Sequence, residues 1–301
     1  MSAGMRSRRT FAVRSLGSLA LIAMTVASTS SVSAQEPAQR VLTIGGSLTE
    51  IVYALGEENR LVGRDQTSQY PAEARSLPDV GYMRALSPEG VLSIDPDLII
   101  ALEGAGPREA MEVIETASVP IVTVPERYDA KGVIAKIEAV GAALGVPEKA
   151  SELAERVSDE LEASATVIGS AEDPATILFI LSLEGGRIMA SGTGTAADGM
   201  IVMAGGKNAI AAFACYKQLT DEAIIEAAPD VILLMDRGGA THDPAVDEIA
   251  AHPALSATPA AQSSRIIRMD GSYLLGFGPR TAEAMTELSR ALYPPADAAA
   301  Q

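Results

Sequence analysis

Two stretches of this chain follow the same order: a Ser/Thr-x-Glu helix start, a Pro-Asp pair, and then a run of apolar residues. The first starts at Ser87 and leads to the run Leu98–Leu102, and the second starts at Thr220 and leads to Val231–Met235. A strand that is apolar at every position is typical of a parallel sheet covered by helices on both faces. Other short apolar runs alternate with helical patterns on short connections, which predicts an α/β fold. The repeated order predicts two lobes of related plan.

A long helical pattern occupies the middle of the chain between these two stretches. Gly145-Val-Pro147 ends one helix and starts the next, which we predict from Glu148 to about Ile168. Its apolar positions, which recur every four residues as a single stripe, are Leu153, Val157 and Leu161. Such a helix is either a surface helix of one lobe or a rigid connection between two lobes.

The first 34 residues resemble an export signal more than a part of the fold. They contain four arginines and no acid, an apolar run from Leu16 to Ala27, and the small-residue pattern Val32-Ser-Ala34. The apolar run is too short to span a bilayer, although an N-terminal membrane anchor is the alternative. We expect cleavage after about Ala34 and a mature chain in the periplasm. Arg8-Arg9 keeps both the secretory and the twin-arginine route open.

The composition excludes several classes of partner. The formal net charge of the 301-residue chain is −16, which argues against nucleic acid and anionic membrane as partners. Hydrophobic residues make up 48% of the chain, which is enough for a large core, whereas aromatic residues make up only 4% and tryptophan is absent. A stacking platform for sugars or bases is therefore not expected.

Cysteine and histidine are scarce. Cys215 is the only cysteine, so the chain has no internal disulfide, thiolate zinc site or iron–sulfur cluster, and we expect this residue to be a small buried filler. The two histidines, His242 and His252, are too few for a typical zinc or manganese uptake site and offer no clear nucleophile–base pair. These absences argue against a hydrolytic enzyme.

Tyr70 lies in the loop Arg64–Pro71, which follows a short apolar strand. Pro71 biases Tyr70 away from the helical conformation, and loops at the carboxyl ends of strands are where α/β folds bind ligands. On the local pattern alone, Tyr70 is more simply interpreted as a surface tyrosine in a turn. Its phenolate is a hard anionic oxygen that suits ferric iron, and tyrosine is one of the side chains that ligate haem iron. Upstream, Ser47 with Glu50 three residues later predicts a helix capping box.

Motifs on both sides of Tyr70 and in the second half of the chain carry a family resemblance: Gly45-Gly-Ser-Leu-Thr-Glu50, Gly81-Tyr-Met-Arg-Ala-Leu-Ser-Pro-Glu-Gly90 and Gly192-Thr-Gly-Thr-Ala-Ala-Asp198. The chain resembles the haem-binding proteins of bacterial haem ABC importers, which are class III binding proteins. The resemblance covers roughly residues 40 to 294. It implies two Rossmann-like α/β lobes, 35–145 and 173–301, joined by a single long backbone helix within 146–172.

The resemblance also implies roles for individual residues. Tyr70 would be the axial ligand of the haem iron, and Arg237 would support the tyrosinate from the second lobe. Arg84 would pair with a haem propionate, and His242 is a possible second ligand. Apolar walls of the site would come from Tyr82, Met83, Tyr273, Leu275 and Phe277. Each of these residues also has an ordinary structural reading, as a solvated arginine, a loop histidine or a core side chain.

The implied function is capture of haem b (hemin) as a transported ligand, without catalysis. The protein would be a monomer that delivers haem to an inner-membrane ABC permease and its ATPase, downstream of an outer-membrane haem receptor system. Glu89 and Glu222, at matching places in the first turn of a helix in each lobe, would dock onto the permease, besides complementing the helix dipoles.

Three other functions stay open on the residues alone. The same fold would bind a corrinoid or a ferric siderophore with Tyr70 as a wall residue. A haem-degrading enzyme or metal-dependent hydrolase would need catalytic groups that the motifs do not supply. A structural periplasmic module would have its cleft filled by apolar side chains.

Overall fold

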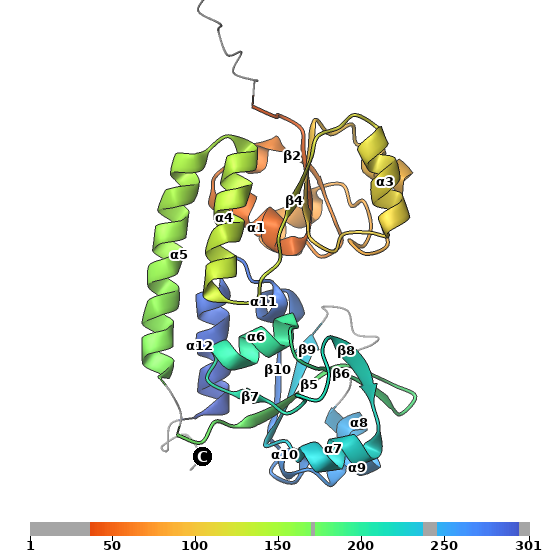
Figure 1. The fold of residues 1–301 in the computed structure, drawn as a ribbon, viewed down its shortest axis with the longest axis vertical. Helices are drawn as coiled ribbons and strands as arrows, with labels where there is room; N and C mark the ends of the chain where they lie inside the picture. The colour runs from red at the N-terminus through yellow and green to blue at the C-terminus, as the bar shows by residue number, and fades with distance from the viewer. Residues whose placement is uncertain (1–36, 170–171, 237–245, 295–301) are drawn as a thin grey trace, which may run out of the picture. The chain divides into compact units, whose positions relative to one another are not determined.

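The computed structural model describes residues 37–169, 172–236 and 246–294 and has a mixed α/β fold, as predicted (Figure 1). The first half of the chain builds a parallel sheet of four strands in the order β2-β1-β3-β4. Its strands are β1 (Val41–Ile44), β2 (Leu61–Arg64), β3 (Leu98–Leu102) and β4 (Ile121–Val124). We call it the N-terminal sheet. All five residues of β3 are buried, which confirms the strand predicted there.

Helices connect the strands of the N-terminal sheet, as a parallel order requires. They are α1 (Gly46–Ala54), α2 (Pro88–Ser93) and α3 (Arg108–Thr116), with the short 3-10 helices η1 (Glu58–Arg60) and η2 (Ala72–Ser76). Because all four strands run in one direction, the loops after β1, β2, β3 and β4 leave from the same edge of the sheet. The Tyr70 loop follows β2 at this edge.

The second half of the chain builds a six-stranded sheet, which we call the C-terminal sheet. Its path is β10-β9-β5-β6-β8, and β7 pairs with β5. The strands are β5 (Thr176–Glu184), β6 (Arg187–Ser191), β7 (Lys207–Asn208), β8 (Tyr216–Leu219), β9 (Val231–Asp236) and β10 (Ile266–Asp270). The pairs β10–β9, β9–β5 and β5–β7 are parallel, whereas β6 and β8 run antiparallel to their neighbours.

Seven helices of the described chain accompany the C-terminal sheet. They are α6 (Ala196–Met203), α7 (Asp221–Ala227), α8 (Val246–Ala251), α9 (Pro253–Ser256), α10 (Pro259–Gln262), α11 (Gly271–Leu275) and α12 (Thr281–Leu292). None of the helices in the three described ranges is long and apolar enough to cross a membrane.

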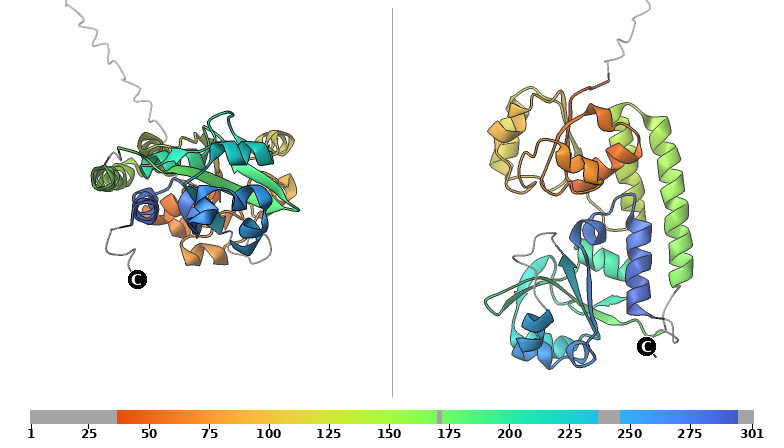
Figure 2. Two further views of the ribbon diagram at one scale, coloured as in Figure 1. Left: turned by 90° about the horizontal axis from the view of Figure 1, so that it is seen from below. Right: turned by 180° about the vertical axis from the view of Figure 1, so that it is seen from behind.

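Two helices lie between the sheets in the sequence, α4 (Ala130–Leu144) and α5 (Pro147–Ile168). Gly145 ends α4 in the left-handed conformation, and Pro147 starts α5 at its first turn. The predicted apolar stripe of α5 is buried and packs on α4 and on α12, which comes from the far end of the chain (Figures 1 and 2). The helix is confirmed; the lobe boundaries 35–145 and 173–301 stay predictions.

Two local predictions are confirmed and two are wrong. Ser87 caps α2 and Thr220 caps α7 with their hydroxyls, as predicted. The capping box at Ser47 is wrong: α1 begins at Gly46 without a side-chain cap, and Ser47 and Glu50 are buried and bonded elsewhere. Cys215 is exposed rather than a buried filler, because it lies in a left-handed turn (φ 66°) just before an edge strand of the C-terminal sheet.

Candidate functional site

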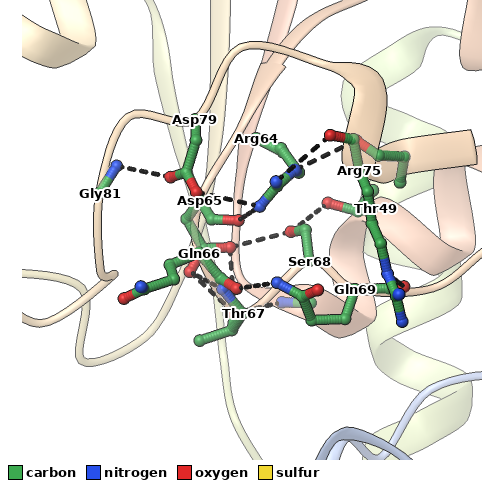
Figure 3. A network of polar contacts seen from close by, with 12 residues as sticks. Thr49, Arg64, Asp65, Gln66, Thr67, Ser68, Gln69, Arg75, Asp79 and Gly81 are labelled. Carbon is green, nitrogen blue, oxygen red and sulfur yellow. Dashed lines mark hydrogen bonds and ion pairs between the residues drawn. The ribbon is translucent and has the colours of Figure 1, made fainter. Parts of the chain in front are cut away.

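A buried aspartate organises the start of the Tyr70 loop. Asp65 is fully buried, and its carboxylate accepts hydrogen bonds from the backbone N–H of Gly45 (3.0 Å) and of Thr67 (2.9 Å) and from the hydroxyl of Ser68 (2.9 Å) (Figure 3). Hydrogen bonds of backbone amides to an ionised carboxylate are among the stronger ones in proteins. Asp65 therefore fixes the loop after β2 to the loop after β1.

A chain of hydroxyl groups continues this network into the sheet. Ser68 Oγ lies 2.6 Å from Thr49 Oγ1, which lies 2.7 Å from Thr43 Oγ1. All three side chains are fully buried. Since each hydroxyl both donates and accepts, buried groups of this kind stabilise one arrangement of the loop when all are paired.

An arginine holds the far side of the same loop. Arg64, at the end of β2, donates to the carbonyl oxygens of Ala74 (3.1 Å) and Asp65 (3.0 Å) and pairs with Asp79 (3.3 Å) (Figure 3). Arg75 donates from Nε to the carbonyl of Gln69 (3.0 Å). With both ends of the loop held, Tyr70 is presented to solvent with 45% of its surface exposed.

The guanidinium of Arg280 covers the ring of Tyr70. Its Cζ lies 3.5 Å from the centre of that ring and 5.1 Å from the centre of the Tyr273 ring. Glu50 holds Arg280 in place, because its carboxylate accepts from Nη2 (2.8 Å) and from the backbone N–H of Arg280 (3.2 Å). The two tyrosines thus meet around one cation that is fixed by a buried carboxylate.

Charge and burial shift the pKa values of two groups in this cluster. Burial opposes the charged form of Arg280 and would lower its pKa. The hydrogen bond and negative charge of Glu50, together with the charges of Tyr70 and Asp270, outweigh burial, so the pKa of Arg280 is raised. Burial, followed by the charges of Glu287 and Glu283, raises the pKa of Tyr273 to about 12. Arg280 is therefore a permanent cation, and Tyr273 is a neutral phenol beside it.

A buried lysine holds the segment that carries Arg280. The Lys136 side chain is completely buried, and its Nζ donates to the carboxylate of Glu126 (2.6 Å), the hydroxyl of Ser47 (3.2 Å) and the carbonyl of Phe277 (3.1 Å). Ser47 is on α1, Glu126 follows β4, and Phe277 precedes α12. Lys136 and Arg280 together attach the turn before α12 to α1.

The structure brings together only some of the predicted site residues. Tyr70 and Tyr273 flank Arg280, whereas Met83 and Phe277 are buried in the core, with Phe277 edge-on to Tyr128 at 5.3 Å between ring centres. Tyr82 is 44% exposed, Leu275 is half-buried and Arg84 is exposed. Arg237 and His242 lie outside the described residues.

The two predicted docking residues both lie in the first turn of a helix, as the sequence pattern indicated. Glu89 and Glu222 are exposed in the first turns of α2 and α7. Hydrogen bonds from its own backbone N–H and from Thr220 lower the pKa of Glu222. Their role toward a permease stays a prediction.

Sequence reasoning missed Arg280 and Glu50. Glu50 fits a helix start as well as a buried ion pair, and nothing local distinguishes the two. Arg280 directly follows Gly278-Pro279, a turn signal that marks a loop and thus a possible site position. No spacing rule connects it to Tyr70.

Comparisons with known proteins identify the family and the fold of the chain. The family described as "Periplasmic binding protein" matches residues 41–273, and the chain belongs to this family. Its fold matches the class III periplasmic binding proteins. A solved structure of the periplasmic heme-binding protein BhuT with two hemes is 41% identical, with a TM-score of 0.78 over 84% of this chain and 97% of that one. The apo form of the periplasmic heme-binding protein RhuT from Roseiflexus sp. RS-1 is 38% identical, with a TM-score of 0.79 over 85% and 98%.

Relatives found by sequence are more distant. The ABC transporter substrate-binding lipoprotein YvrC of Bacillus subtilis (strain 168) is 29% identical over 89% of this chain and 84% of its own length. A vitamin B12-binding protein of Vibrio campbellii is 27% identical over 66% of this chain and 71% of its own length. The family therefore includes proteins with different ligands.

Proposed function

We propose that this protein captures haem in the periplasm and delivers it, without catalysis, to an inner-membrane ABC permease and its ATPase. The observation that carries the proposal is Tyr70 itself: an exposed phenol on a rigid loop, with its ring covered by Arg280 and that guanidinium fixed by Glu50. A nearby cation stabilises a phenolate, the form of tyrosine that ligates ferric iron. The BhuT and RhuT structures, which carry heme-binding in their names, support haem as the ligand.

In this proposal Tyr70 is the iron ligand and Arg280 stabilises its negative charge. Arg237 remains a second candidate for that support, and His242 remains a candidate second ligand. Among the described residues no group of three or more His, Cys, Asp or Glu side chains is placed to hold a metal ion. The iron would therefore arrive already bound by the four nitrogens of its porphyrin, and the protein would add one oxygen ligand.

The remaining parts of the proposal concern the path of the haem. An export signal over residues 1–34 would bring the chain to the periplasm. Haem would enter through an outer-membrane haem receptor system, and a monomer of this protein would carry it onward. Glu89 and Glu222 would contact basic residues of the permease, because exposed charges steer association.

An absorbance titration with ferric haem tests the proposal. We expect the wild-type protein to bind haem saturably with a high-spin, tyrosinate-type spectrum. Tyr70→Phe keeps the ring that Arg280 covers but removes the oxygen, so this spectrum should be lost. Tyr82→Phe is the matched control, since Tyr82 is equally exposed (44% against 45%) and is not the proposed ligand. A Tyr70→Phe protein with the wild-type spectrum would refute Tyr70 as the ligand.

A corrinoid is the second candidate, and the vitamin B12-binding relatives favour it. Competition between haem and cyanocobalamin decides between them. We expect excess cyanocobalamin to leave the haem spectrum unchanged. If cobalamin binds more tightly than haem and Tyr70→Phe has no effect on its binding, the protein is a corrinoid carrier. A ferric siderophore is tested by the same competition.

A further inference from the structure

The turn between α11 and α12, residues 276–280, is bonded to residues from the first half of the chain. The buried ammonium of Lys136 donates to the carbonyl oxygen of Phe277 at 3.1 Å and lies 3.5 Å from that of Gly276. The backbone N–H and Nη2 of Arg280 both donate to the carboxylate of Glu50 on α1. We call residues 276–280 the Arg280 turn.

The backbone of the Arg280 turn lies close to α1. Gly278 is buried, and a Cβ atom at this position would come within 3.4 Å of Ser47 and of the Glu50 carboxylate. Phe277 has a left-handed backbone conformation (φ 49°), which is uncommon for an aromatic residue, and its ring packs edge-on against Tyr128. Such a conformation costs energy and persists only where its surroundings impose it. The contacts with the first half of the chain therefore hold the turn in a shape that it would not adopt alone.

Arg280 connects this turn to the proposed iron ligand. Its guanidinium lies 3.5 Å from the centre of the Tyr70 ring, and its main chain is bonded to Glu50. The guanidinium therefore covers the ring while the turn is attached to α1. Ligation of ferric iron uses the phenolate form of Tyr70, and a phenolate attracts a cation more strongly than a phenol does.

We propose that the Arg280 turn opens from and closes onto α1, and that ligation of iron by Tyr70 favours the closed form. The inference rests on the proposed function and adds a conformational equilibrium to it. Only the closed form places a cation beside the phenolate, so the closed form binds haem more tightly than the open form. A ligand that binds one form better shifts the population toward that form. Because this linkage is reciprocal, opening of the turn weakens haem binding by the factor by which haem favours closure.

The backbone N–H of Arg280 reports whether the turn is closed. It donates to Glu50 Oε1 at 3.2 Å, a residue 230 positions away in the sequence, so its exchange with solvent requires the turn to leave α1. If Arg280 strengthens haem binding about tenfold, saturating hemin should slow the hydrogen exchange of this amide about tenfold. The amide of Gln262, which is bonded to Thr258 at the end of α10, is the reference for any general effect of hemin.

Hydrogen exchange measured by mass spectrometry, with fragmentation that isolates the amide at position 280, tests the inference. Tyr70→Phe and Arg280→Ala should each abolish the slowing by hemin. Ser47→Ala removes one acceptor of Lys136 and none of the contacts of Arg280. It should therefore speed the exchange at position 280 in the free protein severalfold, and hemin should slow it again. Ser151→Ala, which removes an exposed hydroxyl from α5, is the matched control and should leave this exchange unchanged.

The outcomes separate the conformational equilibrium from the proposed function. If hemin gives the tyrosinate spectrum but slows the amide at position 280 no more than that of Gln262, the equilibrium is overturned and the proposed function stands. The equilibrium is equally overturned if Arg280→Ala keeps the slowing by hemin, or if Ser47→Ala exchanges at the wild-type rate. If the wild-type protein gives no tyrosinate spectrum with hemin, the proposed function fails and this inference fails with it.

Discussion

The contact between Arg280 and Tyr70 depends on the shape of the guanidinium as well as on its charge. A planar guanidinium lies flat on an aromatic ring and still presents its N–H groups in the plane, whereas an ammonium does neither. At Arg280 one face is used for Tyr70 at 3.5 Å, and Nη2 is used for Glu50 at 2.8 Å. The phenol oxygen of Tyr70 stays available for a ligand because the cation lies over the ring.

This arrangement predicts the effect of replacing Arg280. Arg280→Ala should weaken haem binding about tenfold or more, the effect of losing a charge-assisted interaction, and should shift the phenolate-to-iron charge-transfer band. Arg280→Lys should recover only part of the affinity, because it keeps the charge and loses the planar contact. Absorbance titrations of both variants measure the two effects. A band unmoved in Arg280→Ala would show that Arg280 has no influence on the ligand oxygen.

The sequence predicts Tyr70 but not its partner, for a physical reason. A strand, a loop and a proline define the position of Tyr70 locally, and residue chemistry suggests its ligand. Arg280 reaches Tyr70 only through the packing of the turn before α12 onto α1, which depends on Lys136 and Glu50. Glu50 is misread as a cap because an acid near a helix start satisfies the local pattern in both cases.

At the scale of elements, the start of α5 is attached to the N-terminal sheet by one carboxylate. Glu57, just before η1, accepts from Lys149 of α5 at 2.5 Å and from Arg60 at 3.0 Å. Arg60 also donates to the carbonyl of Leu144, the last residue of α4. The turn between α4 and α5 is therefore held at both of its ends.

This cluster predicts a loss of stability in acid. The hydrogen bond from Lys149 lowers the pKa of Glu57 below its ordinary 4.5. Burial acts in the opposite direction, but the hydrogen bond from Arg60 and the positive charges of Lys149 and Arg60 add to the lowering. A lowered pKa in the folded state means that the stabilisation is present above pH 4.5 and is lost as the pH falls through the folded value. Glu57→Gln should reduce the free energy of unfolding at neutral pH by about 1 kcal/mol and flatten its dependence on pH in this acidic range.

Urea unfolding at a series of pH values measures this effect. Glu152→Gln, which removes an exposed carboxylate from α5, the helix of Lys149, is the matched control and should keep the wild-type pH dependence. If Glu57→Gln and wild type lose stability in parallel below pH 4.5, the acid sensitivity comes from other carboxylates.

The sequence predicts those helices and strands whose conformation is determined by their own residues. The buried strand β3, the caps of α2 and α7, and the stripe of α5 follow from apolar periodicity and cap chemistry. Strands β6 and β8 are not predicted, because both carry polar residues and form by antiparallel pairing, β6 with β5 and β8 with β6. Their strand conformation is a property of the sheet rather than of their local sequence.

At the scale of the whole chain, Lys136 connects residues from three distant parts of the sequence. Its side chain is completely buried, and its ammonium contacts α1, the loop after β4 and the turn before α12. Burial lowers the pKa of Lys136, and the charge of Glu126 acts against this shift. A buried cation of this kind is stable only while all of its acceptors stay in place, so it ties the two ends of the described chain to each other.

Lys136→Met fills nearly the same space without the charge and should destabilise the protein strongly. It leaves the largely buried Glu126 without its partner, and breaking a buried pair costs about 3–5 kcal/mol. The double variant with Glu126→Gln should recover a large part of this loss, because no unpaired charge remains.

Urea unfolding followed by circular dichroism measures both variants, since the chain has no tryptophan to report by fluorescence. If the double variant is as unstable as Lys136→Met, the bonds to Ser47 and Phe277 carry the stability instead. A loss below about 1 kcal/mol for the single variant would mean that Lys136 does not hold the chain together.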